Sequence, residues 1–289
     1  MLTRLRVGVA VALGAAYVFV GPTSPALAGG SPVRFDASTG PDAVTPKVVT
    51  ARCPTGSLFA TGARIVGGDG GVVLTAMVPD ATSDSVTVTA AARAWYDGAW
   101  SLTAFAVCDR SASPPGVVSE TAHGQASVTV SCPGESRLTG AGFRSDGWGE
   151  HVGVREVAIG PGLRDVRVGV SGSATPASLT AYGICKPETG PAGVLVTNAG
   201  QFTGNWPKVT STEDAPPDMR VYGVAATVTG PADAFLTALV PGVDQNVAVA
   251  EATRGGPQTG GGLRVADDAE DEEDDGSLSA SGIFNATFH

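Results

Sequence analysis

Residues that could carry out catalysis are few in this chain of 289 residues, which holds three His and four Cys. A nucleophilic triad could combine His123 or His151 with a Ser and an Asp, because such groups need only meet in space. No G-x-S-x-G elbow, H-E-x-x-H zinc motif or phosphate-binding Gly-Lys loop is present in the sequence. We therefore expect exposed loop histidines, and a protein that is not an enzyme and has no catalytic residues, cofactor or metal.

An acidic run at residues 267–275 is the other segment with possible chemistry. It can be aligned with a calcium loop in which Asp271, Glu273 and Asp275 precede Gly276. Position twelve of that loop would be Gly282, where a bidentate Glu is needed. The sequence favours a solvated acidic loop interrupting a hairpin, with loose binding of divalent cations as the alternative.

Aromatic residues offer a better candidate for ligand binding. Trp95 and Trp100 flank a segment that contains Asp97-Gly98, a pair typical of two-residue hairpin turns. In that register the two Trp would face each other across the hairpin. Paired aromatics can stack on the apolar face of a sugar ring, but they also stabilise hairpins, and both readings remain open.

Gly-rich loops are a second candidate. Corresponding loops hold Asp69 in one part of the chain, Asp146 with Trp148 and His151 in another, and Asp233 in a third. If the three parts fold alike, these loops would lie on one rim. A rim with acids and aromatics is typical of shallow polar sites for carbohydrate, although turn formation alone also explains Gly and Asp there.

Three copies of one motif indicate the elements that must position these residues. The copies are Ser101–Cys108 (SLTAFAVC), Ser178–Cys185 (SLTAYGIC) and Ser277–Phe284 (SLSASGIF). Self-similarity of this kind is the signature of a repeat protein, and a residue in only one copy is not required by the shared fold. The sequence predicts β repeats at 29–111, 112–188 and 189–289. An ungapped shift of 161 residues places Asp214 at the position of Cys53 and Gly223 at that of Gly62.

The period between these motifs is that of β-strands. Ser85-Val86-Thr87-Val88-Thr89 and similar segments alternate small or polar residues with Val, and no helical period appears after the N-terminal stretch. We predict an all-β protein in which each repeat holds five or six short antiparallel strands. The repeats either form one pseudo-threefold prism or three packed β-sandwich modules.

The cysteines fall at equivalent positions of two repeats. Cys53 and Cys108 bracket the first repeat, and Cys132 and Cys185 bracket the second. In the third repeat both positions are changed together, to Asp214 and Phe284, as expected for the loss of a bonded pair. We predict two structural disulfides, Cys53–Cys108 and Cys132–Cys185.

The N-terminus predicts export. Arg4 and Arg6 precede an apolar stretch at 7–20, and Ala26-Leu27-Ala28 forms a cleavage pattern. We predict a signal peptide at 1–28, a secreted, extracellular protein, and no membrane span in the mature chain. Cleavage takes the 18 basic residues to 16 against 28 acidic ones, which argues against nucleic acid as a partner.

One resemblance accompanies these patterns. Cys53-Pro54-Thr55-Gly56 and Cys132-Pro133-Gly134, each followed by a Gly-rich strand and closed by the L-T-A-aromatic-x-x-Cys motif, resemble a repeat in uncharacterised exported proteins of actinomycete type. The resemblance implies a disulfide-tied β module and no particular activity. The sequence therefore leaves two functions open. One is binding of extracellular or cell-surface polysaccharide, and the other is a structural or protein-interaction role in the cell envelope.

Overall fold

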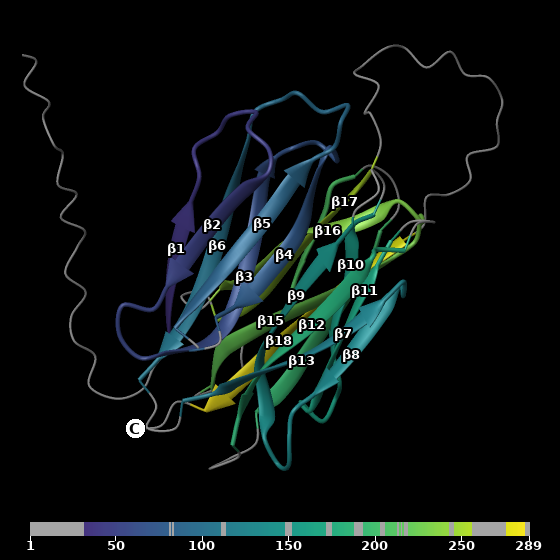
Figure 1. The fold of residues 1–289 in the computed structure, drawn as a ribbon. Coiled ribbons are helices and arrows are strands. Elements are labelled where there is room, and N and C mark those ends of the chain that lie inside the picture. The colour runs from purple at the N-terminus through teal and green to yellow at the C-terminus, as the bar shows by residue number, and fades with distance from the viewer. Residues whose placement is uncertain are drawn as a thin grey trace, which may run out of the picture.

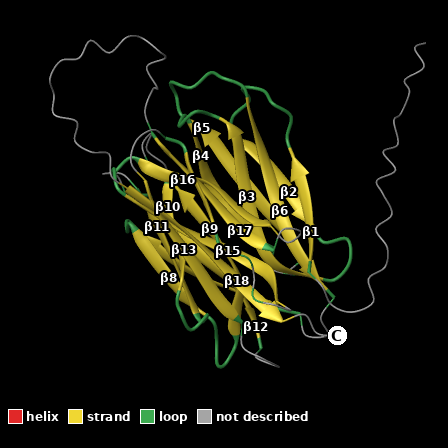
Figure 2. Ribbon diagram, turned by 180° about the vertical axis from the view of Figure 1, so that it is seen from behind, coloured by secondary structure: helices red, strands yellow, loops and turns green. Residues whose placement is uncertain are grey.

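The computed structural model describes most of the chain downstream of the predicted signal peptide. The described residues are 32–255 and 276–286, apart from gaps at 81, 83, 111–113, 148–151, 172–174, 188–192, 203–205, 213, 215, 217–218 and 243–245. The predicted signal peptide (1–28) and acidic run (267–275) lie outside them. The described residues contain strands and no helix (Figure 2), which confirms the all-β prediction.

Each repeat contributes six strands, in agreement with the five or six predicted. The first has β1 (Val33–Ser38), β2 (Lys47–Arg52), β3 (Ser57–Gly67), β4 (Val72–Pro79), β5 (Ser85–Ala92) and β6 (Trp100–Asp109). The second has β7 (Gly116–His123), β8 (Ser127–Ser131), β9 (Arg137–Asp146), β10 (Val154–Ile159), β11 (Asp165–Val170) and β12 (Ser178–Lys186). The third has β13 (Val194–Phe202), β14 (Lys208–Ser211), β15 (Met219–Thr229), β16 (Ala234–Gly242), β17 (Val247–Arg254) and β18 (Gly276–Ala286).

The strands form three six-stranded antiparallel sheets, and every sheet draws on two repeats. Sheet A has the order β1-β6-β3-β16-β17-β14, sheet B β2-β5-β4-β9-β12-β7, and sheet C β13-β18-β15-β10-β11-β8. The first, third and sixth strands of one repeat thus pair with the second, fourth and fifth strands of another. Because the third repeat completes the sheet begun by the first, the three repeats interlock in a ring (Figure 1).

The third strand of each repeat lies at the centre of the molecule, where β3, β9 and β15 contact one another. Close approach requires small residues: a Cβ on Gly140 of β9 would lie only 2.6 Å from the Cα of Ala60 in β3. Two threonines satisfy backbone carbonyls across this junction, since the hydroxyl of Thr139 donates to the carbonyl of Phe59 at 2.7 Å and that of Thr61 donates to the carbonyl of Ala141.

One hydrophobic core contains buried residues from all three sheets. Outside the strand junctions the sheets show the predicted alternation, as in β5, where Val86 and Val88 are fully buried while Thr87 and Thr89 are partly exposed. Repeats that share sheets and a core form the prism-like arrangement, and each repeat alone would lack half of every sheet it enters.

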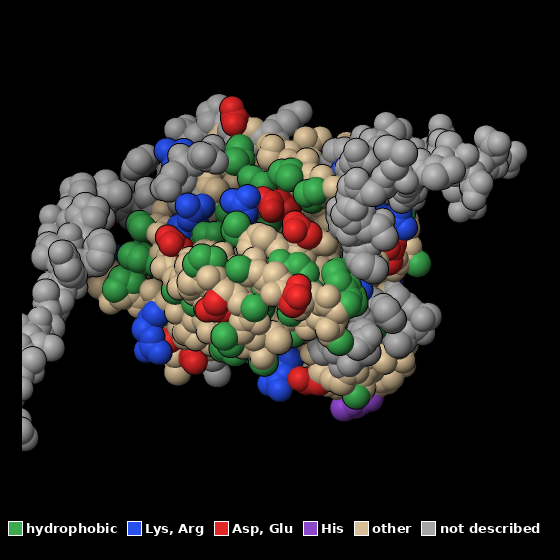
Figure 3. All heavy atoms as spheres, turned by 90° about the horizontal axis from the view of Figure 1, so that it is seen from above, with side chains coloured by type: hydrophobic (Ala, Val, Ile, Leu, Met, Phe, Trp, Pro, Cys, Tyr) green, Lys and Arg blue, Asp and Glu red, His purple; other side chains and the backbone are tan. Residues whose placement is uncertain are grey.

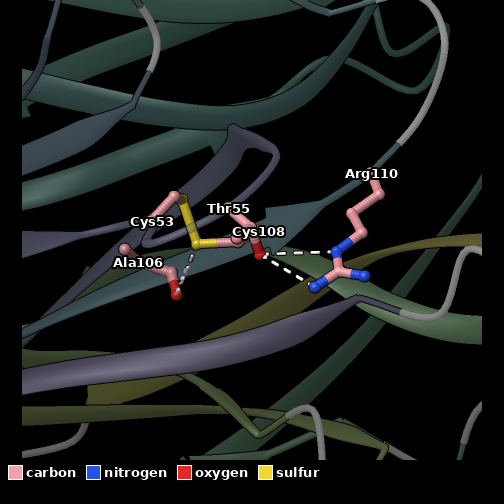
Figure 4. Close-up of a disulfide and its surroundings, with 5 residues drawn as sticks. All are labelled: Cys53, Thr55, Ala106, Cys108 and Arg110. Carbon is pink, nitrogen blue, oxygen red and sulfur yellow. Dashed lines mark hydrogen bonds between the residues drawn. A yellow bond between two sulfur atoms is a disulfide. The ribbon is translucent and has the colours of Figure 1, made fainter. Parts of the chain in front are cut away.

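The disulfides join neighbouring sheets. Cys53 follows β2 of sheet B and bonds to Cys108 in β6 of sheet A, with 5.7 Å between the Cα atoms. Figure 4 shows this bond beside Thr55, whose hydroxyl accepts hydrogen bonds from Arg110. The bond between Cys132 and Cys185 ties sheet C to sheet B in the same way, so both predicted pairings are confirmed.

The seam between sheets A and C has an aromatic ring in place of a disulfide. Phe284 of β18 is fully buried, and its ring and the side chain of Ala248 from β17 both lie against Gly282. The apolar ring occupies the position that Cys108 and Cys185 take in the other repeats.

Strand register corrects the alignment of the third repeat. Cys108 pairs with Leu58, whereas Phe284 pairs with Val221, so the third strands correspond with a shift of 163 residues. Gly62 is therefore equivalent to Ala225, and the ungapped shift of 161 that placed Gly223 there was wrong. The two additional residues fall between β14 and β15, in a connection that the repeated motifs do not cover.

Candidate binding surfaces

The loops between the third and fourth strands of the repeats meet at one end of the prism. Gly70, in the loop after β3, packs against the carbonyl of Arg254 at the end of β17. Arg254 in turn forms an ion pair with Asp233 of the loop before β16, at 3.1 Å between Nε and Oδ1. Gly153, in the loop before β10, lies against Phe235. We call this end, formed by 67–71, 93–99, 152–153, 230–235 and Arg254, the rim.

Figure 3 views the molecule from this end, where acidic and basic side chains lie next to one another among apolar ones. Asp69 is exposed at the tip of the first loop, with φ of 35° between glycines that also have positive φ. Gly70 cannot carry a side chain, because its Cβ would collide with the carbonyl of Arg254. Turn geometry therefore accounts for the glycines, while Asp69 is left free to face solvent.

Asp146 and Asp233, the other two predicted acids, are already engaged by arginines. Asp146, the last residue of β9, accepts hydrogen bonds from Nε of Arg144 at 3.0 and 3.1 Å and from the hydroxyl of Ser178 at 3.2 Å. The carboxylate raises the pKa of Arg144 above its ordinary value, chiefly through the hydrogen bond. Trp148 and His151, predicted in the same loop, lie outside the described residues.

The two tryptophans do not face each other across a hairpin. β5 belongs to sheet B and β6 to sheet A, so 93–99 cross from one sheet to the next, and the predicted hairpin was wrong. In all three repeats the fifth and sixth strands lie in different sheets. The hairpin predicted around the acidic run, between β17 and β18, is therefore also wrong.

Trp100 is a core residue, 1% exposed, and its backbone pairs with Gly67 in β3. The ammonium group of Lys47 lies 4.7 Å from the centre of its ring and is ion-paired with Asp42 at 2.8 Å. This contact lowers the pKa of Asp42, mainly through the hydrogen bond from Lys47. Trp100 is therefore structural, and the prediction of a ligand-binding role for it was wrong.

Trp95 has a different environment, because it lies on the surface with 36% of its area exposed. Its ring meets Tyr96 edge to face, at 6.1 Å between centroids and 83° between planes. Tyr96 covers Gly71 and Gly98, and its hydroxyl accepts a hydrogen bond from the amide of Gly68 at 3.1 Å. The loop that carries Asp69 is thus tied to the segment that carries Trp95.

Tyr96 and Arg254 are rim residues that sequence reasoning missed. The sequence signal for Tyr96 was the presence of glycines near it, because Gly71 and Gly98 have no side chain and so leave room for its ring. Arg254 had no local signal, because its partner Asp233 lies in another strand connection.

The outer faces of two sheets also carry grooves, which the sequence did not predict. A groove of about 350 Å³ on sheet A lies among Arg34, Arg64, Phe105, Val240, Val249 and Glu251. A groove of about 340 Å³ on sheet B lies among Thr75, Val78, Thr87, Thr89, Arg144 and Asp146. The sequence signal that the two grooves share is an arginine at equivalent positions of β3 and β9, Arg64 and Arg144.

The fold and these surfaces define a disulfide-tied, all-β repeat protein with an open polar rim. No protein-family model matches the sequence, and no curated protein matches it either. Within the described ranges, no three His, Cys, Asp or Glu residues are grouped so as to hold a metal ion. Those ranges also include no helix with the length and apolarity needed to cross a membrane.

Proposed function

We propose that the protein is a secreted, non-enzymatic module that binds extracellular or cell-surface polysaccharide at the rim. The observation that carries the proposal is that Tyr96 contacts the exposed ring of Trp95 and also, through the amide of Gly68, the loop that carries the exposed Asp69. An aromatic ring with one solvent-facing side stacks on the C–H face of a sugar, and a neighbouring carboxylate accepts hydrogen bonds from its hydroxyls. Pre-ordered side chains reduce the entropy lost on binding.

Secretion is supported by two independent features. The N-terminal sequence has the charged, apolar and small-residue regions of a signal peptide. Two disulfides without any free cysteine among the described residues are typical of a chain that folds in an oxidising compartment. An exported protein with a polar rim meets polysaccharides of its own envelope or of its surroundings.

The test is depletion of the mature chain, residues 29–289, by insoluble polysaccharides such as cellulose, chitin and bacterial cell-wall preparations. The proposal predicts saturable binding that Trp95→Ala abolishes and Trp95→Phe retains in part. Trp95 is exposed, so its replacement leaves the fold intact, and the circular dichroism spectrum checks this. Binding that is unchanged in Trp95→Ala would show that the polysaccharide does not bind at the rim.

A second candidate function, association through sheet edges, is favoured by a separate observation. Four of the exposed large hydrophobic residues lie on edge strands, namely Val33 on β1, Val48 on β2, Val194 on β13 and Val209 on β14. Exposed β-branched residues on an unpaired strand edge favour pairing with another chain. Sedimentation of the mature chain tests this candidate: a larger species that Val48→Lys and Val209→Lys dissociate would support it, and a monomer at all concentrations would exclude self-association.

A further inference from the structure

The groove on the outer face of sheet A lies at the junction between the first and third repeats. β3 and β16 form this junction, and only two residue pairs join them, Arg64 with Ala238 and Ala63 with Leu239. The outer face at this junction carries the groove, whose lining includes Arg64 of β3 and Val240 of β16. Its volume of about 350 Å³ is in the range of small-molecule sites.

Two guanidinium groups and one carboxylate line this groove. Nη2 of Arg64 lies 2.6 Å from Oε1 of Glu251, and Glu251 is the sole polar partner that the described residues give to the Arg64 side chain. That side chain is 47% exposed. Arginine has five N–H donors, so most donors of Arg64 still face the groove and the solvent.

Arg34 provides the second positive charge. Its guanidinium lies 5.1 Å from the centre of the Phe105 ring, and its Nη1 donates a hydrogen bond to the carbonyl of Pro241 at 3.0 Å. The side chain therefore reaches from the edge strand β1 across the sheet to β16. It holds a positive charge in place at the groove in a protein whose net charge is −10.

Comparison of the three repeats shows that the fold does not require this pair of charges. Strand register places Val117 and Leu195 at the position of Arg34, and Thr89 and Gly169 at the position of Glu251. Arg144 is equivalent to Arg64, but its guanidinium is engaged by Asp146 on its own strand. Arg34 and Arg64 of sheet A, by contrast, line the same groove.

We propose that this groove binds the carboxylate of an acidic sugar, with Arg64 and Arg34 as the anion-binding residues. A guanidinium fork matches a carboxylate in a bidentate arrangement, and charge-assisted bonds of this kind are strong. Val240 and Val249 provide apolar walls for the ring of the sugar. The choice of a sugar as the ligand class rests on the proposed function, whereas the site is distinct from the rim.

Glu251 has an opposing role in this arrangement. Its carboxylate occupies the position nearest to Arg64 and competes with a bound anion for the same donors. Removal of its charge should therefore strengthen binding, while removal of the charge of Arg64 should weaken it. Opposite signs for two partners of one ion pair cannot arise from a general loss of stability.

The experiment is calorimetric titration of the mature chain with trigalacturonic acid, with maltotriose as the neutral probe and acetate as the free carboxylate. The expected result is saturable binding of trigalacturonic acid that rising salt weakens, with a Kd raised about tenfold by Arg64→Gln and lowered by Glu251→Gln. Arg144→Gln, the matched change on sheet B, should leave the Kd unaltered. Acetate that binds as tightly as the trisaccharide would assign the groove to simple anions and overturn the choice of a sugar.

Failure of this inference and failure of the rim proposal have different signatures. If trigalacturonic acid does not bind, or if Arg64→Gln and Glu251→Gln leave its Kd unchanged, the groove is not an acidic-sugar site, and binding of other glycans at Trp95 is unaffected. In the other outcome, trigalacturonic acid binds with the predicted effects of Arg64→Gln and Glu251→Gln while Trp95→Ala changes no glycan binding. That result supports the acidic-sugar site in the groove and overturns the glycan site at the rim.

Discussion

The hydroxyl of Tyr222 in β15 donates a hydrogen bond to Oδ2 of Asp109 in β6, at 2.8 Å. Both side chains are buried, at 2% and 5% exposure. The bond connects sheet C to sheet A, the pair of sheets that neither disulfide joins. The hydrogen bond thus joins the third repeat to the first, in addition to the pairing of β16 with β3.

Tyr222→Phe removes the hydrogen bond and leaves a buried carboxylate without its donor, because Oδ1 of Asp109 has no hydrogen-bond partner among the described residues. We expect a loss of about 1.5–3 kcal/mol in the free energy of unfolding, measured with denaturant. Tyr182→Phe is the matched control, since Tyr182 lies partly exposed on an outer face and should cost little. Equal effects for the two variants would contradict a role for the Tyr222 contact.

Alkaline pH should weaken the same contact. Burial, followed by the charge of Asp109, raises the pKa of Tyr222 far above its ordinary value of 10.0. Above pH 10 the unfolded chain releases the tyrosine proton and the folded chain retains it, so the free energy of unfolding falls as pH rises. The advantage of the wild type over Tyr222→Phe should shrink by about 1.4 kcal/mol per pH unit above 10. An advantage that stays constant up to about pH 11 would mean that Tyr222 ionises equally in both states.

The other two seams should respond to loss of their disulfides. Replacement of Cys53 and Cys108 by Ala, or of Cys132 and Cys185 by Ala, should lower the free energy of unfolding by about 2–5 kcal/mol. The bonds tie different pairs of sheets, so both variants should show the loss in denaturant unfolding. An unchanged unfolding midpoint in either variant would mean that its seam is held by packing alone.

Phe284→Ala tests the packing that replaces the third disulfide. The fully buried ring lies between sheets A and C, and its removal should cost about 3–5 kcal/mol through lost burial and the cavity that remains. Phe284→Leu retains most of the volume and should cost markedly less. A similar loss for both substitutions would indicate that the aromatic shape, rather than the filled volume, is required.

The sequence predicted the features that repeat and missed those that depend on which strands pair. Repetition of the SLTA motif and the positions of Cys53 and Cys108 were sufficient for an all-β repeat protein with two disulfides. A period of two reports that a strand has a buried face, but it does not identify the sheet that the strand enters. For this reason Asp97-Gly98 indicated a hairpin where the chain crosses between sheets, and the buried Trp100 was kept as a candidate ligand contact beside its structural reading.

The candidate site was predictable only in part for the same reason. Equivalent loops were expected to share a rim, and the contacts of Gly70 and Gly153 bring them together. Trp95 was expected to be available and is exposed. The ion pair in the groove of sheet A could not be predicted, because Arg64 and Glu251 come from different repeats and meet only when the third repeat completes sheet A.

The most direct test of the proposed function is a glycan array probed with residues 29–289, beside Trp95→Ala and Trp95→Phe variants of verified fold. The account predicts saturable binding of the wild type to a restricted set of glycans, loss of that binding in Trp95→Ala, and partial retention in Trp95→Phe, because the ring supplies the stacking surface. No glycan bound by the wild type, or binding that persists in Trp95→Ala, would contradict carbohydrate recognition at the rim.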